Sequence, residues 1–167
     1  IQFQPFRTQL AARQRYWARS MVGYPRMAEA TPNGVHRALV SLGARGVLGR
    51  LVTQSVDALR RRAGQRQVLD LHGRLARVRC LDCGHRSSRA LLQRRLEALN
   101  PAFAASLSRP VVSAPDGDAD LDDEASLATF QVPPCLRCGG VLKPDVVFFG
   151  ESVPGARVAR VRSARQD

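Results

Sequence analysis

The fold is decided by two stretches that share one pattern, CLDC at residues 80–83 and CLRC at residues 135–138. Two residues between paired cysteines let both sulfurs face one metal ion, and the glycine after each pair permits a tight turn. Two such pairs supply the four thiolates of a tetrahedral zinc site. The sequence therefore predicts a zinc site whose ligands are Cys80, Cys83, Cys135 and Cys138.

The predicted zinc module contains a long insertion, because 51 residues separate the two cysteine pairs. Disulfides are the first alternative to a metal, and free thiols are the second. Zinc is favoured over both, because the chain has no other cysteine and each pair carries its glycine. A shell of four cysteines leaves no position for water, so we expect this zinc to stabilise the fold and the chemistry to come from other residues.

Strand-like and helical segments alternate before the first cysteine pair. This alternation predicts an α/β fold with a parallel sheet. The composition of residues 23–25 (Gly-Tyr-Pro) predicts a turn near the beginning of the chain. The elements expected from apolar periodicity are a helix over 35–42, a strand over 47–56, the start of a helix over 57–62 and a strand over 68–71.

The residues between and after the cysteine pairs change in character. Leucines at helical spacing over residues 91–99 predict a helix that Ser88 caps. Six acidic residues within 116–124 predict a solvated loop. Residues 146–149 are apolar and predict a strand, whereas the arginine-rich residues 155–167 are expected to be poorly ordered.

The net charge of +12 rests on 25 arginines and a single lysine, Lys143. Arginine can bind nucleic-acid phosphates, but these arginines are scattered along the chain. We therefore expect a solvated basic surface and no dedicated nucleic-acid partner. No run of 18 apolar residues is present, so we expect neither a membrane-spanning helix nor a membrane partner.

Four further motifs surround the cysteine pairs: TQSVDAL at 53–59, AG at 63–64, LHG at 71–73 and LKPDVVFFGE at 142–151. In this order and spacing, the motifs and the cysteine pairs resemble the core of the sirtuin family, the NAD-dependent protein deacylases. The resemblance covers roughly residues 12–154. The sequence RQRYW at 13–17, Ala58 and the long insertion are most similar to the mitochondrial class II, sirtuin-four-like branch.

The resemblance implies a fold class and a division of the chain. The implied fold is α/β, a partial Rossmann-type parallel sheet with an inserted small zinc-binding module. The implied parts are a Rossmann-type domain over 1–79 and 141–154, a zinc module with a helical and acidic insertion over 80–140, and a disordered tail over 155–167.

The resemblance also implies an activity. Sirtuins remove an acyl group from protein lysine, consume NAD and release nicotinamide and O-acyl-ADP-ribose, and some members are described as ADP-ribosyltransferases or lipoamidases. The implied cofactors and partners are NAD, a structural zinc ion and proteins with acylated lysines. His72 matches the catalytic histidine, a general base that takes a proton from a ribose hydroxyl after the acyl oxygen has attacked the sugar. Without the resemblance, a lone histidine is better explained as a surface or capping residue.

Two further segments match binding sites of the family. The first lies at the end of a predicted strand, where nucleotide crevices form, although Asp57 could also cap the next helix. The second would pair with an extended peptide, although a plain buried strand is the alternative. The matching residues are Gln54, Ser55, Val56 and Asp57 for NAD, and Val146, Val147, Phe148 and Phe149 for the acyl-lysine peptide.

Several features depart from the family pattern. The glycine-rich phosphate loop and the later strands have no counterpart, Ser55 stands where the family has Asn, and Arg60 stands where His is common. A lost hydrogen bond at Ser55 would cost about 1–3 kcal/mol. We therefore expect a chain that is truncated at both ends and inactive, with a mitochondrial matrix location implied by the branch. The alternative function is a non-catalytic zinc scaffold that binds nucleic acid or an acidic protein partner.

Overall fold

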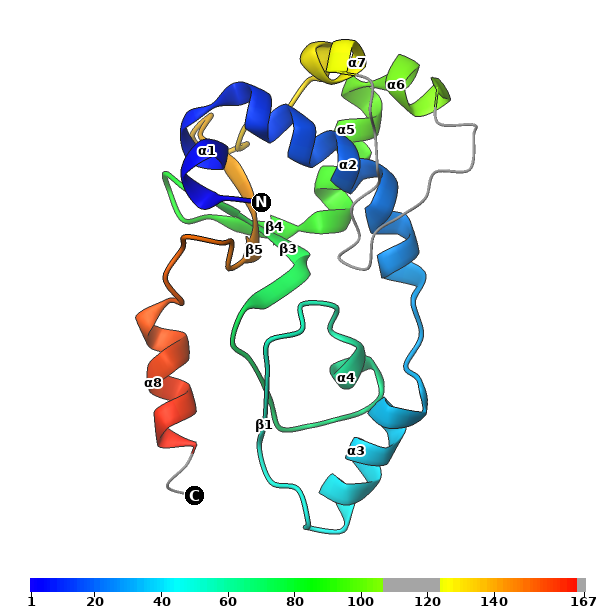
Figure 1. Cartoon of the computed structure of the whole chain (residues 1–167), viewed down its shortest axis with the longest axis vertical. Helices are drawn as coiled ribbons and strands as arrows, with labels where there is room; N and C mark the ends of the chain where they lie inside the picture. The colour runs from blue at the N-terminus through cyan, green and yellow to red at the C-terminus, as the bar shows by residue number, and fades with distance from the viewer. Residues whose placement is uncertain (107–123, 165–167) are drawn as a thin grey trace.

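Figure 1 shows the computed structural model of the chain, which describes residues 1–106 and 124–164. The acidic loop predicted over 116–124 lies outside these residues except for Glu124. The helices are α1 (Phe3–Thr8), α2 (Leu10–Glu29), α3 (Gly34–Ala44), α4 (Leu59–Arg62), α5 (Arg89–Leu99), α6 (Pro101–Ser106), α7 (Glu124–Thr129) and α8 (Gly155–Ser163). The strands are β1 (Leu51–Thr53), β2 (Val68–Asp70), β3 (Gly73–Cys80), β4 (Arg86–Ser88) and β5 (Leu142–Val146).

The strands form two small sheets. In the first sheet, β1 and β2 run parallel, with Leu51 opposite Val68 and Thr53 opposite Asp70. In the second sheet, β3 pairs antiparallel with β4 on one side and with β5 on the other. Helix α4 lies between the two parallel strands in the chain, as a parallel pair requires a crossover connection. The predicted α/β fold with a parallel sheet is confirmed.

The largest hydrophobic core packs helices α1, α2, α5 and α7 against the antiparallel sheet. Four aromatic rings meet edge to face within it, with centroids 5.4 Å apart for Phe6 and Tyr16, 5.2 Å for Phe6 and Phe148, and 5.0 Å for Tyr16 and Trp17. This is a favoured geometry for aromatic pairs. The parallel pair is less covered, because α3 and α8 bury none of their residues. The main core therefore supports the sheet that bears the cysteines.

Helix α2 continues through the segment where the sequence predicts a turn. Pro25 lies inside α2, and a proline cannot donate to the carbonyl four residues earlier, that of Met21. Gln93 Nε2, from α5, donates to this carbonyl instead at 2.8 Å. The prediction of a turn over 23–25 is wrong, because a side chain distant in sequence replaces the hydrogen bond that proline removes.

Arg89 anchors the first turn of α5 to the same stretch of α2. Its side chain is buried, and Nη2 donates to the carbonyl of Ser20 at 3.0 Å and to the Ser20 hydroxyl at 3.1 Å. The guanidinium lies 4.4 Å from the ring centroid of Tyr24, a cation–π contact. Burial lowers the pKa of Arg89 to about 10, since desolvation disfavours the charged form. The helix that follows the first cysteine pair is thus fixed to the N-terminal helices.

Two of the predicted helices form, and each begins at a side-chain cap. Ser88 Oγ accepts a hydrogen bond from Leu91 N at 3.1 Å and caps α5, as predicted. Asn33 caps α3 in the same way, through a hydrogen bond of 3.2 Å from His36 N. The predicted cap at Ser88 is thus confirmed, whereas the cap at Asn33 was not predicted, although the local sequence carries the same signal.

The residues after Gly155 differ from the prediction of a poorly ordered tail, because they form α8 as far as Ser163. Arg157 Nη2 donates to Asp145 Oδ1 at 2.6 Å and joins α8 to β5. A helix with little apolar pattern is held here by an ion pair, which periodicity does not reveal. Residues 165–167 lie outside the described part of the chain.

The strand pairing crosses the predicted domain boundaries. Strand β3 runs from Gly73 to the first cysteine, and β5 runs from the second cysteine pair to Val146. Each strand therefore extends from a cysteine pair into the antiparallel sheet. The division at residues 79–80 and 140–141 stays a prediction. None of the helices in the described residues is long and apolar enough to cross a membrane.

Candidate functional site

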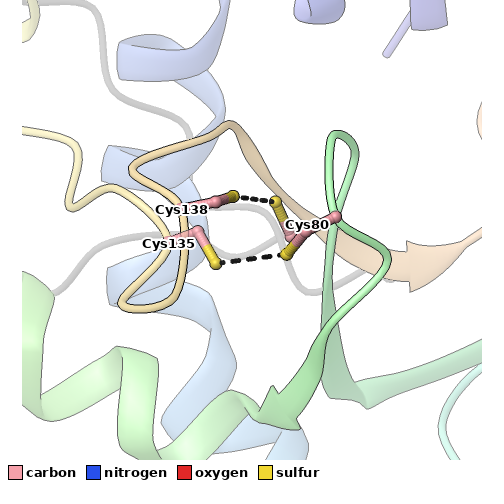
Figure 2. A group of neighbouring side chains, drawn as sticks. Cys80, Cys135 and Cys138 are labelled. Carbon is pink, nitrogen blue, oxygen red and sulfur yellow. Dashed lines mark hydrogen bonds between the residues drawn. The ribbon is translucent and has the colours of Figure 1, made fainter.

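The four cysteine sulfurs gather at one point between the end of β3 and the beginning of β5. All four Sγ atoms lie within 4.8 Å of one another. Figure 2 shows Cys80, Cys135 and Cys138 with their sulfurs turned toward the same space. Sulfurs that bind zinc at about 2.3 Å in a tetrahedron lie about 3.8 Å apart. The sulfurs of Cys80 and Cys138 lie 3.6 Å apart and those of Cys83 and Cys135 lie 3.8 Å apart, so the four cysteines are positioned to bind a zinc ion.

The sulfur separations also decide between zinc and disulfides. All four cysteines are free, and each pair contributes a sulfur to both of these contacts with the other pair. A disulfide requires about 2.05 Å between sulfurs, far less than the 3.6 and 3.8 Å observed here. The arrangement fits a shared metal ion and not a pair of disulfides.

Glycines shape the turn behind each cysteine pair, as the sequence predicts. Gly84 and Gly139 have φ angles of 70° and 74°, in the left-handed region that favours glycine. Their N–H groups donate to the carbonyls of Cys80 at 3.1 Å and Cys135 at 2.9 Å. The two turns therefore have the same hydrogen bond and the same backbone geometry.

Asp82 and Gly140 join the two cysteine pairs directly. Val141 N donates to Asp82 Oδ2 at 2.8 Å. A Cβ at Gly140 would lie 2.1 Å from the same oxygen, so a larger residue there would displace the Asp82 side chain from this position. The backbone N–H of Arg137 lowers the pKa of Cys135 to about 7, so this sulfur can supply a thiolate near neutral pH. By contrast, the pKa of Cys138 is raised, because the backbone N–H of Gly140, which lowers it, is together outweighed by the nearby sulfurs of Cys83 and Cys80.

The predicted NAD segment, residues 54–57, forms the loop between β1 and α4. Asp57 Oδ1 accepts a hydrogen bond from the N–H of Leu59, the first residue of α4, at 2.8 Å, but the N-cap position itself is held by Ala58. Ser55 Oγ donates to Asp57 Oδ2 at 3.1 Å. Gln54 is exposed, and its side-chain amide has no partner among the residues that the structure describes. The loop thus presents one free amide next to an internally bonded Ser–Asp pair.

Backbone hydrogen bonds place His72 beside this loop. The N–H groups of Leu71 and Leu75, on either side of His72, donate to the carbonyls of Thr53 at 2.9 Å and Val56 at 3.0 Å. His72 is half-buried in the turn between β2 and β3. The loop and the turn lie at the carboxyl ends of the two parallel strands, where ligands bind in open α/β sheets.

The predicted peptide segment, residues 146–149, runs past the same turn. Val147 N donates to the carbonyl of His72 at 2.9 Å. Only Val146 belongs to a strand, β5, so the predicted strand over 146–149 has the wrong bounds. Phe149 instead forms an isolated parallel bridge with Gln2, and its side chain is 75% exposed. The structure therefore brings together all three segments that the sequence singled out.

Lys143 and Glu151 form an ion pair beneath the peptide segment that sequence reasoning did not single out. Lys143 is 3% exposed, and burial lowers its pKa because desolvation disfavours the ammonium form. Lys143 also donates to the carbonyl of Val146, and Glu151 Oε2 accepts from Phe148 N at 3.0 Å. The available signal was that the one lysine of the chain shares a motif with this glutamate.

Gly73, the third residue of the LHG motif, has a steric role that the sequence did not reveal. Its φ is 88°, and a Cβ added there would lie 1.9 Å from the carbonyl oxygen of Asp145. The turn that carries His72 can therefore approach β5 only with glycine at this position. Gly73 is directly opposite Val146 in the strand register.

Comparisons with known proteins agree with this geometry. Residues 3–166 match the Sir2 family. The chain is 56% identical over 160 residues to an NAD-dependent protein deacetylase of Xanthomonas axonopodis pv. citri (strain 306), a match that covers 96% of this chain and 53% of that protein. It is 52% identical over 164 residues to an NAD-dependent protein deacetylase of Bordetella bronchiseptica, covering 98% of this chain and 58% of that protein. The chain belongs to the Sir2 family, the sirtuins, and spans about half the length of these curated relatives.

Solved structures of the family share the fold. A Sir2 homologue mutant in complex with ADP-ribose superposes with a TM-score of 0.62 at 28% identity, over 96% of this chain and 50% of that one. A Sir2 homologue in complex with NAD gives 0.63 at 27% identity, over 96% and 48% of the two chains. Sir2Tm bound to a propionylated peptide gives 0.68 at 23% identity, over 98% and 54%, which supports the fold alone. The sirtuin Rossmann-like α/β fold with a parallel sheet is thereby confirmed.

Proposed function

We propose that this chain carries the catalytic histidine and the peptide-binding segment of an NAD-dependent protein-lysine deacetylase. The observation that carries the proposal is the meeting of three segments at the carboxyl ends of β1 and β2. These segments are residues 54–57, His72 and residues 146–149, and they are joined by backbone hydrogen bonds of 2.9–3.0 Å. The names of the relatives, NAD-dependent protein deacetylases, support the same reaction.

Each segment has a role in the proposed reaction. His72 acts as the general base toward a ribose hydroxyl. The free amide of Gln54 and the Ser55–Asp57 pair contact the nicotinamide ribose of NAD, the co-substrate. The exposed edge and side chain at Phe149 contact the acyl-lysine peptide, the protein partner of the reaction. The zinc ion would stabilise the antiparallel sheet. It would take no part in the reaction, since four cysteine ligands leave no coordination site for water.

The capacity of these 167 residues to turn over NAD unaided is a separate proposal. The glycine-rich phosphate loop of the family is not among them, and Ser55 stands in the place of an amide. Ser55 Oγ already donates to Asp57, so it offers a ligand fewer hydrogen bonds than an asparagine would. We therefore expect little or no nicotinamide release by the isolated chain, as the sequence predicts.

The narrower assignments stay predictions. They are a wider deacylase range with lipoamidase or ADP-ribosyltransferase activity, membership of the mitochondrial class II branch and a mitochondrial matrix location. The relatives named above come from Xanthomonas and Bordetella, which are bacteria, so they lend no support to the mitochondrial placement. Assay of a panel of acyl-lysine peptides would test the acyl range directly.

A segment exchange tests the proposed function. Residues 3–166 of this chain replace the matching region of the Xanthomonas deacetylase, which supplies the remaining half of the protein. We expect the hybrid to release nicotinamide from NAD in the presence of an acetyl-lysine peptide. The same hybrid with His72→Ala should lose this release while keeping its zinc content and melting temperature. A folded hybrid that shows no release, or release that does not need His72, would overturn the proposal.

The second candidate function is the non-catalytic scaffold that binds an acidic partner or nucleic acid. One observation favours it: a groove between α4, β3 and β4 is lined by five arginines. The exchange experiment separates the two functions, because a pure scaffold would leave the hybrid without turnover. The groove is also compatible with the proposed enzyme, because it adjoins the proposed reaction site.

A further inference from the structure

A groove lined by arginines lies along the sheet surface beside α4. Its cavity volume is about 630 Å3, and its arginines come from α4, β3 and β4. A second cavity of about 310 Å3 adjoins it, shares four of these arginines and extends to α8. Together we call them the arginine groove. The five arginines of the first cavity are Arg61, Arg62, Arg74, Arg77 and Arg86.

The arginine groove has a strong excess of positive charge. Arg157 and Arg160 of α8 line the second cavity, so the described lining holds seven arginines against two aspartates, a net charge of +5. Arg77 and Arg160 are exposed, and neither side chain has a partner among the described residues. Like charges held side by side repel one another, so an anionic ligand would be stabilised here.

The groove already shows which anion fits it. Asp70 Oδ2 accepts from Arg61 Nε at 3.0 Å and from Arg74 at 2.6 Å. Asp145 is held in the same way by Arg86 at 3.3 Å and by an arginine of α8. Carboxylates therefore fit between pairs of these guanidinium groups, a geometry that arginine favours.

A nucleic acid fits the groove less well than an acidic peptide. Single strands bind through bases stacked on aromatic side chains, and none of the described lining residues is aromatic. The observations favour a peptide with acidic side chains.

The groove adjoins the proposed reaction site. Arg74 is two residues from His72 and lies opposite Asp145 in the strand register, while Gly73 lies opposite Val146. A peptide that contacts residues 146–149 would therefore bring its neighbouring residues close to the groove. We infer that the arginine groove docks an acidic segment of the protein substrate and so selects substrates with glutamates or aspartates near the acylated lysine. The selection of substrates with an acylated lysine rests on the proposed function. The binding of an acidic peptide to the arginine groove does not rest on it.

Fluorescent peptides of equal length test the inference on the chain itself. One carries four glutamates beside an acetyl-lysine, a second replaces them with glutamines, and a third has the glutamates but an unmodified lysine. By fluorescence anisotropy at low salt, we expect both glutamate peptides to bind about tenfold or more tightly than the glutamine peptide, with the difference shrinking as salt rises.

Matched variants locate the binding. Arg77→Glu and, separately, Arg160→Glu should remove the preference for glutamate peptides. Arg94→Glu, an exposed charge reversal on α5 outside the groove, should not. Circular dichroism confirms that each variant folds, and Arg160→Glu serves if Arg77→Glu does not. Three outcomes would overturn the inference. They are equal affinity for glutamate and glutamine peptides, an effect of Arg94→Glu as large as that of Arg77→Glu, and binding of a short DNA strand in preference to the glutamate peptides. A preference for acetyl-lysine over unmodified lysine between the two glutamate peptides reports on the proposed function alone.

Discussion

Lys143 Nζ lies 2.8 Å from Glu151 Oε2, and the pair is almost closed to solvent, with the lysine side chain 4% exposed and the glutamate 21%. Each member also binds one backbone group of the segment that passes His72. Lys143 reaches the carbonyl of Val146, and Glu151 accepts from the N–H of Phe148. The ion pair therefore positions the backbone of the proposed peptide-binding edge, in addition to neutralising the buried ammonium group of Lys143.

Replacement of this lysine should destabilise the fold. Lys143→Met keeps the bulk of the side chain but leaves the Glu151 carboxylate without its cation, and we expect a loss of about 3 kcal/mol in the free energy of unfolding. Urea denaturation measures this loss. Arg86→Met breaks an ion pair whose arginine is 56% exposed, so it should cost less than about 1 kcal/mol. Equal costs for the two variants would show that the burial of Lys143 does not matter.

The same lysine predicts a pH dependence of stability. Burial lowers the pKa of Lys143 below its ordinary value of 10.5, so in this window the unfolded chain binds the proton more strongly than the folded chain. Stability from this group therefore rises as pH increases from the lowered pKa toward 10.5, and it is constant below that window. Denaturation between pH 8 and about 10.5 should show this rise in the parent chain and not in Lys143→Met. Parallel pH profiles of the two proteins would contradict it.

Local signals in the sequence predicted the parts of the molecule that local chemistry determines. The cap at Ser88 and the glycine turns behind the cysteine pairs depend on neighbouring residues, and all of them are confirmed. The ligand set of the metal site could also be predicted, because two repeated short patterns identify it. Fold class followed from the alternation of elements.

Contacts between distant residues account for what the sequence did not reveal. The continuation of α2 through Pro25 depends on Gln93, and the order of α8 depends on an ion pair between Arg157 and Asp145. Periodicity carries no information about either contact. The limits of β5 were missed for the same reason, since Phe149 pairs with Gln2 rather than with a sheet neighbour.

Zinc removal should unfold the antiparallel sheet. Cys80 and Cys135 are part of the main core, at 0% and 3% exposure, so a loss of the metal leaves two thiols crowded inside it, beside the exposed thiols of Cys83 and Cys138. We expect one zinc per chain by elemental analysis, and a large drop in melting temperature with a chelator or with Cys135→Ser. Acid should have the same effect, because protons compete with zinc for the thiolates. His85→Ala, which alters a neighbour that is not a ligand, serves as the control and should retain the metal.

Gly73→Ala should be more damaging than the same change at a matched glycine. Both Gly73 and Gly46 have positive φ, 88° and 74°, so an alanine at either position carries backbone strain of about 1–3 kcal/mol. Only at Gly73 would the new Cβ collide with the carbonyl of Asp145, whereas Gly46 has no atom within 4 Å. The difference between the two unfolding free energies isolates the close approach of the His72 turn to β5. No difference would mean that the turn moves away without cost.

In α2, the side chain of Gln93 makes the hydrogen bond to Met21 that Pro25 cannot make. A double-mutant cycle tests this replacement. Gln93→Leu should cost about 1–3 kcal/mol, because it leaves the carbonyl of Met21 buried without a donor. Pro25→Ala restores an N–H that can donate to the same carbonyl, so in that background the cost of Gln93→Leu should fall by about 1 kcal/mol. Ser88→Ala, which removes the cap of α5 at a distance from this carbonyl, serves as the control and should cost the same with either residue at position 25. Additive effects of Gln93→Leu and Pro25→Ala would show that Gln93 stabilises α2 and α5 by packing alone.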